Sequence, residues 1–309
     1  MKVLITGGSG FVGTHLTKFL LNHGHEVRVY DLQPTTLPEV EFIQGNILDE
    51  RMLYSALHKC DAVVHLAAQV SVHQSILSPN ETHKINVLGT KNVFKCTEKA
   101  KIQRIIVASS AAVYGDAKEI PLKEENTGNL LSPYAHSKAK NEQQVLEAIE
   151  KGREAVALRF FNIYGPNQKT SGSYSAVIPS MLKCITEGQQ PTIYGDGMQT
   201  RDFIHVQDAS ACIVNLLSVP WKDIRNHVYN VASQQQTSVL DLLSSINRAA
   251  IEDGFIQKST EPMFEPAREG DIRHSVADIS RIERDVGWKP QIDFNEGIRS
   301  LVKSWGGGK

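Results

Sequence analysis

The 309-residue sequence has few cysteines, almost no net charge and no long apolar run. Its four cysteines, Cys60, Cys96, Cys184 and Cys212, form no CxxC pair and have no histidine neighbours at metal-site spacing. This scatter argues against a zinc site or a disulfide framework and favours free thiols in a reducing compartment. Apolar runs are too short to cross a bilayer, and Met1 and Lys2 lead directly into an apolar strand rather than a secretory signal. We therefore expect a cytoplasmic protein that binds no metal.

The charge balance excludes another group of partners. The formal net charge is −1 and the isoelectric point lies near 6.8, so no strong field attracts nucleic acid or a membrane surface. Hydrophobic residues make up 41% of the chain and charged residues 22%, as in an ordinary globular protein. Any anionic ligand must therefore be held by local arginines and backbone amides.

What the sequence does contain is a glycine-rich turn close to its start. The apolar run at residues 2–6 predicts a buried strand, and an amphipathic helix follows from Phe11. Between them, Gly7, Gly8, Gly10 and Gly13 satisfy two spacings, GxGxxG and GxxGxxG. Backbone N–H groups and the positive end of a helix meet at such a turn, which predicts a phosphate site. Glycines that only turn a tight corner are the alternative interpretation.

An acidic residue extends this pattern. The second apolar run, at residues 25–30, ends in Asp31, which lies 21 residues after Gly10. A carboxylate at about this distance binds the adenosine ribose of a dinucleotide. It also favours NAD over NADP, because a carboxylate repels a 2′-phosphate. A solvated acid at a strand end is the simpler alternative.

Strands and helices alternate through the first half of the chain, which predicts an α/β fold with a doubly wound parallel sheet. The expected strands are Lys2–Thr6, His25–Tyr30, Val40–Gln44, Asp61–Leu66, Arg104–Ser110 and Ala155–Arg159, and the longest helices are Pro79–Ala100 and Pro133–Lys151. Beyond residue 165 the rhythm loosens. Expected helices there are Tyr174–Glu187, Val206–Ser218, Val239–Ile251, Ser280–Val286 and Phe294–Lys303, with short strands at Phe203–His205 and Val228–Val231. We expect this half to form a smaller, mixed C-terminal lobe over the carboxyl edge of the sheet.

A candidate general base lies at the start of the second long helix. Ser132 and Pro133 are typical of an N-cap and first helical position, so Tyr134 falls in the first turn and Lys138 lies on the same face. The ammonium and the helix end are both expected to lower the pKa of the phenol. The strand before this helix delivers Ser110 to the same edge of the sheet. Taken alone, the Tyr–Lys pair could equally be an exposed pair on a helix flank.

Eight stretches of the sequence together resemble the extended short-chain dehydrogenase/reductases, and within them the UDP-sugar 4-epimerases. They are Thr6–Gly13, His65–Val72, Ser109–Gly115, Tyr134–Lys138, Arg159–Pro166, Tyr194–Phe203, Pro266–Asp271 and Gly287–Trp288. They follow the family's order over nearly the whole chain. The resemblance implies a Rossmann-type, NAD-binding domain at residues 1–165, with elements from about 200–250 returning to it. Residues 166–200 and 251–309 would form the substrate-binding lobe.

The resemblance also assigns roles to individual residues. Ser110, Tyr134 and Lys138 match the catalytic triad. The NAD site would be formed by Gly7, Gly10, Phe11, Val12, Asp31, Asn46, Ile47, Leu66, Ala67, Ala68, Asn86, Tyr134, Lys138 and Phe160. Asn46 stands where many relatives carry aspartate, which makes that contact a departure from the family. The UDP-sugar would be held by Ser110, Tyr134, Asn162, Val177, Tyr194, Arg201, Arg268, Asp271 and Ser275. For each arginine, the alternative is an ion pair with Asp202 or Glu269.

The reaction implied is inversion at C4 of a UDP-hexose through a transient 4-keto sugar. Tyr134 would take the proton of the 4-hydroxyl, and Ser110 would polarise the carbonyl oxygen. A 4,6-dehydratase is disfavoured because relatives carry Asp-Glu where this chain has Ala111 and Ala112. Uronate epimerases, decarboxylases and a non-catalytic NAD-binding protein remain as alternatives, whereas Asp31 disfavours an NADPH-dependent ketoreductase.

Two further expectations concern substrate choice and assembly. Ser275 matches a family position where a bulky residue blocks N-acetylated sugars, so its small side chain predicts that they are accepted. The helices at 79–100 and 133–151 match those through which relatives dimerise, which predicts a homodimer.

Overall fold

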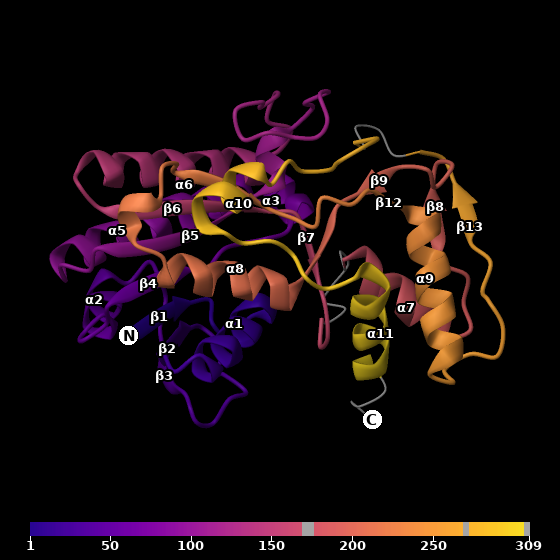
Figure 1. Cartoon of the computed structure of the whole chain (residues 1–309), viewed down its shortest axis with the longest axis horizontal. Coiled ribbons are helices and arrows are strands. Elements are labelled where there is room, and N and C mark those ends of the chain that lie inside the picture. The colour runs from indigo at the N-terminus through magenta and orange to yellow at the C-terminus, as the bar shows by residue number, and fades with distance from the viewer. Residues whose placement is uncertain (169–175, 268–271, 306–309) are drawn as a thin grey trace.

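The computed structural model describes residues 1–168, 176–267 and 272–305. Its centre is a seven-stranded sheet in the order β11-β6-β5-β4-β1-β2-β3, in which every pair of neighbours is parallel (Figure 1). The strands are β1 (Lys2–Thr6), β2 (Glu26–Asp31), β3 (Glu41–Gln44), β4 (Ala62–His65), β5 (Arg104–Ser110), β6 (Glu154–Phe160) and β11 (Val228–Val231). The α/β fold with a doubly wound parallel sheet is thus confirmed.

Both faces of this sheet are buried, which explains why its strands are continuous apolar runs. Val3 and Ile5 belong to the core on one face, and Leu4 between them belongs to the core on the other. The first face is covered by α1 (Phe11–Asn22), α8 (Val206–Ser218) and α10 (Ser280–Val286). The second is covered by α2 (Glu50–Ala56), α5 (Gly89–Lys99) and α6 (Pro133–Glu150).

A smaller lobe has a core of its own, at the right of Figure 1. It contains α7 (Val177–Thr186), α9 (Val239–Glu252) and α11 (Phe294–Trp305), whose apolar faces pack together. Two strand pairs lie beside them: β8 (Thr192–Tyr194) with β13 (Met263–Glu265), and β9 (Thr200–Arg201) with β12 (Thr237–Ser238). The short strands β7 (Asn162–Tyr164) and β10 (Phe203–His205) pair in parallel between the lobe and the sheet.

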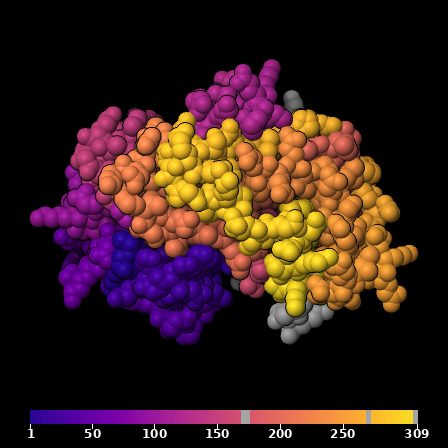
Figure 2. All heavy atoms as spheres, in the orientation of Figure 1, coloured from indigo at the N-terminus to yellow at the C-terminus, as the bar shows by residue number. Residues whose placement is uncertain are grey.

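The chain crosses between the large domain, which contains the seven-stranded sheet, and the small lobe more often than the sequence predicts. As expected, α8 packs on α1 and β11 joins the large sheet. Helix α9, expected to return with them, instead packs against α7 and α11 of the small lobe. In the other direction, the segment that holds α10 leaves the small lobe and lies on the large domain, where it forms a yellow surface strip in Figure 2.

The predicted long helix at 79–100 also differs in detail. Helix α4 (Pro79–His83) runs through a π-helical turn (Lys84–Leu88) into α5, so one residue is inserted into the helical register. A further helix before it, α3 (Val72–Leu77), was not predicted; Ser71 caps its amino end. Searched over the described residues, no helix is long and apolar enough to cross a membrane.

Candidate active site

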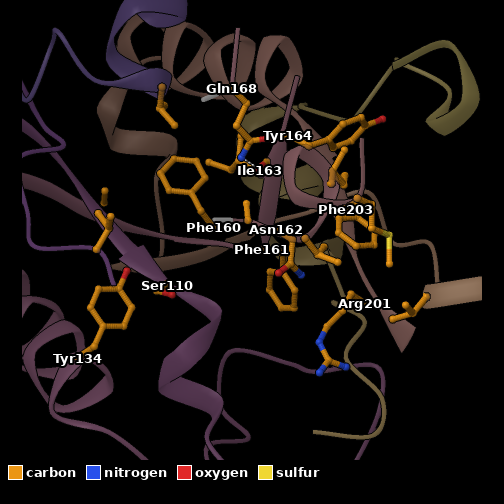
Figure 3. Close-up of a pocket in the computed structure, with 18 of the residues that line it drawn as sticks. Ser110, Tyr134, Phe160, Phe161, Asn162, Ile163, Tyr164, Gln168, Arg201 and Phe203 are labelled. Carbon is orange, nitrogen blue, oxygen red and sulfur yellow. Dashed lines mark hydrogen bonds between the residues drawn. The ribbon is translucent and has the colours of Figure 1, made fainter. Parts of the chain in front are cut away.

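A cavity of about 770 Å³ lies where the carboxyl edge of the large sheet faces the small lobe. From the large domain it is lined by Ser110 at the end of β5, Tyr134 and Lys138 on α6, and Phe160 at the end of β6. The small lobe contributes Val177, Tyr194 and Arg201, among others. Figure 3 shows Ser110 and Tyr134 at one side of this cavity and Arg201 at the other. Of the predicted site residues, Val12, Leu66, Ala68 and Asn162 also line it.

The glycine-rich turn runs from β1 into α1 beside this cavity. Gly7 has a φ of +73°, and a Cβ there would lie 2.6 Å from the backbone nitrogen of Ala67. A Cβ on Gly13 would lie 2.5 Å from the Cα of Gly8. The N-cap of α1 is Gly10, whose lack of a side chain leaves the first N–H groups without a side-chain partner. An uncapped helix end in a glycine cradle suits the phosphates of a dinucleotide.

Asp31 lies at the end of β2, directly beside this turn. One carboxylate oxygen accepts a hydrogen bond from the backbone N–H of Ser9 (3.0 Å), and the other accepts one from the N–H of Gln33 (3.0 Å). The Ser9 hydroxyl donates to the Gln33 carbonyl (2.8 Å). The carboxylate is therefore held at a fixed distance from the glycine turn, and Ser9, Leu32 and Gln33 place no cation there to attract a 2′-phosphate.

The catalytic tyrosine candidate sits in the first turn of α6, as predicted. The Ser132 hydroxyl caps this helix by accepting from the Ala135 N–H (3.1 Å), and the Ser75 hydroxyl of α3 accepts from the Tyr134 N–H (3.1 Å). The phenol is directed toward Ser110 (Figure 3), whose hydrogen bond lowers the pKa of Tyr134. The larger effect is burial, which raises this pKa.

A lowered pKa was predicted, and for the chain by itself that prediction is wrong. The main reason is the burial of the phenol, and a second is where the Lys138 ammonium points. Its Nζ donates to the Ala108 carbonyl (2.7 Å) and lies 5.8 Å from the centre of the Tyr134 ring. Burial in turn lowers the pKa of Lys138 to about 8. In the chain by itself, burial therefore favours the neutral phenol of Tyr134 and disfavours the ammonium form of Lys138.

Other predicted cofactor residues lie close to the turn without lining the cavity. Asn86, in the π-helical turn, is buried. Its amide accepts from the Gln69 N–H (2.8 Å) and donates to the Gln69 carbonyl (3.0 Å) and the Ser137 hydroxyl (3.0 Å). It therefore fixes the loop after β4, which contains Ala67 and Ala68. Asn46 is exposed, whereas Ile47 is buried against Gly89.

The predicted substrate residues are only partly brought together. The Arg201 guanidinium donates to the backbone carbonyls of Thr200 (2.9 Å) and Ile272 (2.6 Å). Asp202, the alternative ion-pair partner, instead accepts from Ser233, Gln234 and Ala277. The Asn162 amide donates to the Asp202 carbonyl (2.9 Å).

One predicted substrate residue lies apart from this group. Ser275 is buried, with its N–H bound to the Thr200 carbonyl, and it does not line the cavity. Arg268 and Asp271 lie outside the described residues.

Comparison with known proteins gives this arrangement a context. The sequence profile described as the NAD dependent epimerase/dehydratase family matches residues 3–232. This chain belongs to that family. The predicted resemblance and the predicted NAD dependence are therefore confirmed at the level of the family. A relative from Methanocaldococcus jannaschii, provisionally named UDP-glucose 4-epimerase, is 35% identical over 97% of both chains.

Solved structures of epimerases superimpose on the whole chain. The UDP-N-acetylglucosamine 4-epimerase from Methanobrevibacter ruminantium, in complex with UDP-N-acetylmuramic acid, is 32% identical with a TM-score of 0.91 and covers 100% of this chain and 99% of its own. The Thermus thermophilus UDP-glucose 4-epimerase in complex with NAD is 30% identical with a TM-score of 0.88, over 100% of both chains.

A relative found by sequence is named for a different reaction. This Bacillus cytotoxicus UDP-N-acetyl-alpha-D-glucosaminuronate decarboxylase is 26% identical over 98% of this chain and 97% of its own.

The structure adds polar residues that sequence reasoning passed over. Glu142 on α6 is buried and binds both Ser109 and Arg159, directly behind the candidate catalytic residues. The signal was present, since Glu142 follows Lys138 by one helical turn and Arg159 ends an apolar strand. The apolar wall of the cavity, which includes Phe161, Ile163, Met181 and Phe203, gave no such signal because apolar residues are expected in any core.

We predict that Gly13→Ala weakens NAD binding by about tenfold or more, because the added methyl group forces the Gly7–Gly8 backbone out of position. Calorimetric titration of NAD into cofactor-free protein measures the effect. Thr14→Ala, which removes only a long 3.5 Å contact to the Ser9 carbonyl, is the control. Unchanged affinity in a folded Gly13→Ala protein would show that the turn does not hold the cofactor.

Proposed function

We propose that the protein inverts the configuration at C4 of a UDP-hexose, UDP-glucose/UDP-galactose or the N-acetylated pair, in an NAD-dependent reaction. The observation that carries this proposal is the cavity, which Lys138 helps to line and which has Ser110 and Tyr134 at one side and Arg201 at the other. A sugar and a diphosphate need such a separation of acid–base and cationic groups. The large domain would bind NAD and the small lobe the UDP-sugar.

In this mechanism Tyr134 removes the proton of the sugar 4-hydroxyl and later returns it. NAD, when bound, supplies the hydride acceptor and a positively charged ring that favours the phenolate. Ser110 holds the oxygen that becomes the carbonyl, and it is oriented because its hydroxyl also accepts from the Ala112 N–H (3.2 Å). Lys138 would hold the nicotinamide ribose through its ammonium group. The 4-keto sugar must turn before it is reduced, which the apolar wall permits because it offers few hydrogen bonds.

The remaining predicted residues would hold the two ligands. Those proposed for NAD are Gly7, Gly10, Phe11, Val12, Asp31, Asn46, Ile47, Leu66, Ala67, Ala68 and Phe160, with Asn86 acting through Gln69. Those proposed for the UDP moiety are Asn162, Val177, Tyr194, Arg201, Arg268 and Asp271. Guanidinium groups suit a diphosphate because their paired donors match its oxygens.

The alternatives differ in what the turn after β5 would have to supply. A dehydratase needs a carboxylic acid there, but Ala111 and Ala112 begin a short 3-10 turn, Ala111–Tyr114, that contains no carboxylate. Uronate decarboxylation needs no added acid at this position, and one relative is named for that reaction. UDP-uronates therefore belong in the substrate panel.

We predict that the purified protein converts UDP-galactose into UDP-glucose with little or no added NAD. Tyr134→Phe should lower kcat by about 10²–10⁴-fold, because it removes the acid–base group but not the ring. Chromatography of the nucleotide sugars measures both, and Tyr54→Phe, at an exposed tyrosine, is the control. Failure of the NAD-loaded protein to interconvert any UDP-hexose would refute the proposal, and CO₂ release from a UDP-uronate would replace it.

Substrate range is proposed to depend on Ser275, whose small side chain leaves room for an N-acetyl group. The structure places Ser275 behind Thr200 and Arg201 rather than in the cavity wall. A larger residue there would have to push toward the sugar. We predict that Ser275→Tyr lowers kcat/KM for UDP-N-acetylglucosamine by at least about tenfold more than for UDP-glucose. Equal losses on both substrates in a product assay would contradict this assignment.

We also propose that the protein is a homodimer formed through residues 79–100 and 133–151. Both segments present exposed leucines, Leu88 at 44% and Leu146 at 40% exposure. Replacing both with glutamate should produce monomers, measured by light scattering, because charges would be buried in the interface. Met263→Glu, at an exposed residue of β13 in the small lobe, is the control. A wild-type protein that is monomeric at micromolar concentration would exclude the dimer.

A cytoplasmic location is proposed as well. Cys60, Cys96, Cys184 and Cys212 are all free thiols in the structure. Thiols of this kind persist in a reducing compartment. Neither nucleic acid nor a membrane is proposed as a partner, given the near-neutral charge.

A further inference from the structure

The carboxylate of Glu142 occupies a buried position directly behind the catalytic residues. One oxygen accepts from the Ser109 hydroxyl (2.6 Å) and from Nε of Arg159 (2.8 Å), and the other accepts from Nη2 of Arg159 (2.8 Å). The side chains of Arg159 and Glu142 are only 5% and 11% exposed. Charged groups are rarely placed so deep unless they are fully paired.

These contacts join three elements that carry the proposed chemistry. Ser109 is the neighbour of Ser110 on β5, and Arg159 is paired with Ser109 in the sheet register on β6. Glu142 lies on α6, two turns after Tyr134 and one turn after Lys138, on the same helical face. The carboxylate therefore fixes the strand that bears the serine against the helix that bears the tyrosine and lysine.

A second contact between α6 and β5 lies one helical turn nearer the cavity. There Lys138 donates to the carbonyl of Ala108, the residue before Ser109. Residues 108, 109 and 110 of one strand thus meet Lys138, Glu142 and Tyr134 of one helix. Loss of the middle contact would loosen both of its neighbours.

Glu142 is also the negative charge that acts on Lys138. Burial disfavours the ammonium, whereas the Glu142 charge favours it. Among the described residues, Tyr134 on the same helix and His65 on β4 also interact with Lys138, and the positive charge of Arg159 on β6 is bound to the Glu142 carboxylate. His65 is buried between Thr6 and Thr90, with its pKa lowered to about 3, so it is neutral near pH 7. Tyr134, with its raised pKa, is neutral as well.

We propose that Glu142 is a positioning residue that keeps Lys138 in its ammonium form and, through Ser109, holds Ser110 in register with Tyr134. Arg159 holds this carboxylate in place by donating hydrogen bonds to both of its oxygens. The kinetic part of this inference rests on the proposed function. The protonation of Lys138 does not.

The decisive variant is Glu142→Gln, which keeps the shape and removes the charge. Lysines labelled with ¹³C at Cε are titrated by NMR, and Lys138→Arg assigns the Lys138 signal. Its midpoint, near 8 in the wild type, should fall by about one pH unit. Glu147→Gln, which removes an exposed charge from the same helix, should leave it unchanged. An unchanged midpoint in folded Glu142→Gln would overturn the proposal.

The kinetic readout separates charge from structure. In Glu142→Gln the alkaline limb of the kcat profile should move toward acid by the same amount, because the ammonium is lost at lower pH. A uniform loss at every pH would mean a structural role only, and would also overturn the proposal. Glu142→Asp retains the charge and should restore the wild-type midpoint.

Ser109→Ala tests the second part and also serves if Glu142→Gln does not fold. It keeps the ion pair but removes the link to β5, so kcat should fall about tenfold while the Lys138 midpoint stays in place. A kcat equal to the wild type would refute the link through Ser109. If no UDP-sugar reacts but the Lys138 midpoint shifts as expected, the proposed function fails and the inference on Lys138 stands.

Discussion

The attachment of α6 to β5 and β6 is the constraint on which the relative positions of Ser110, Tyr134 and Lys138 depend. A helix packed on a parallel sheet through apolar contacts alone could slide along it by a fraction of a turn without losing much buried area. Here, directional hydrogen bonds remove that freedom, because Lys138 donates to β5 and Glu142 accepts from Ser109 of β5 and Arg159 of β6. They are strong because water is excluded from them, and for the same reason an unpaired partner would be costly.

Close backbone contacts and hydrogen bonds also fix the segments that follow β1 and β4. The Gly7 turn touches the backbone of Ala67, and Asn86 holds the loop that follows Ala68 by binding the backbone of Gln69. The π-helical turn places Asn86 so that its carbonyl accepts from Asn141 of α6 (2.7 Å). Asn86 therefore links the loop after β4 to α6, through its side chain on Gln69 and Ser137 and through its backbone carbonyl on Asn141.

Much of this could be predicted from the sequence because it depends on short, local patterns. Residues 2–13 specify strand, turn and helix within a dozen positions, and Ser132–Pro133 marks the start of α6 to the residue. Strand order beyond β6 could not be predicted, since the pairing of β11 with β6 joins residues about 70 apart. Local patterns carry no information on such pairings. For that reason the sequence wrongly assigns α9 to the large domain and α10 to the small lobe.

The misjudged pKa of Tyr134 has a similar origin. Sequence spacing correctly placed a lysine one turn from the tyrosine, but charge coupling depends on where the ammonium points and on how much water remains. Ala108 offered a backbone carbonyl that no side-chain pattern reveals. Burial, the larger effect, is a property of the whole cavity, which the small lobe completes.

The return of residues 279–288 to the large domain has a consequence for how the protein is made. Ile282, Val286 and Trp288 belong to the same core as Val3 and Ile5, although nearly the whole chain separates them. During synthesis the first strands leave the ribosome long before the residues that cover one end of their core exist. The large domain therefore cannot complete this core until residues 279–288 have been made, by which point most of the small lobe has also been synthesised.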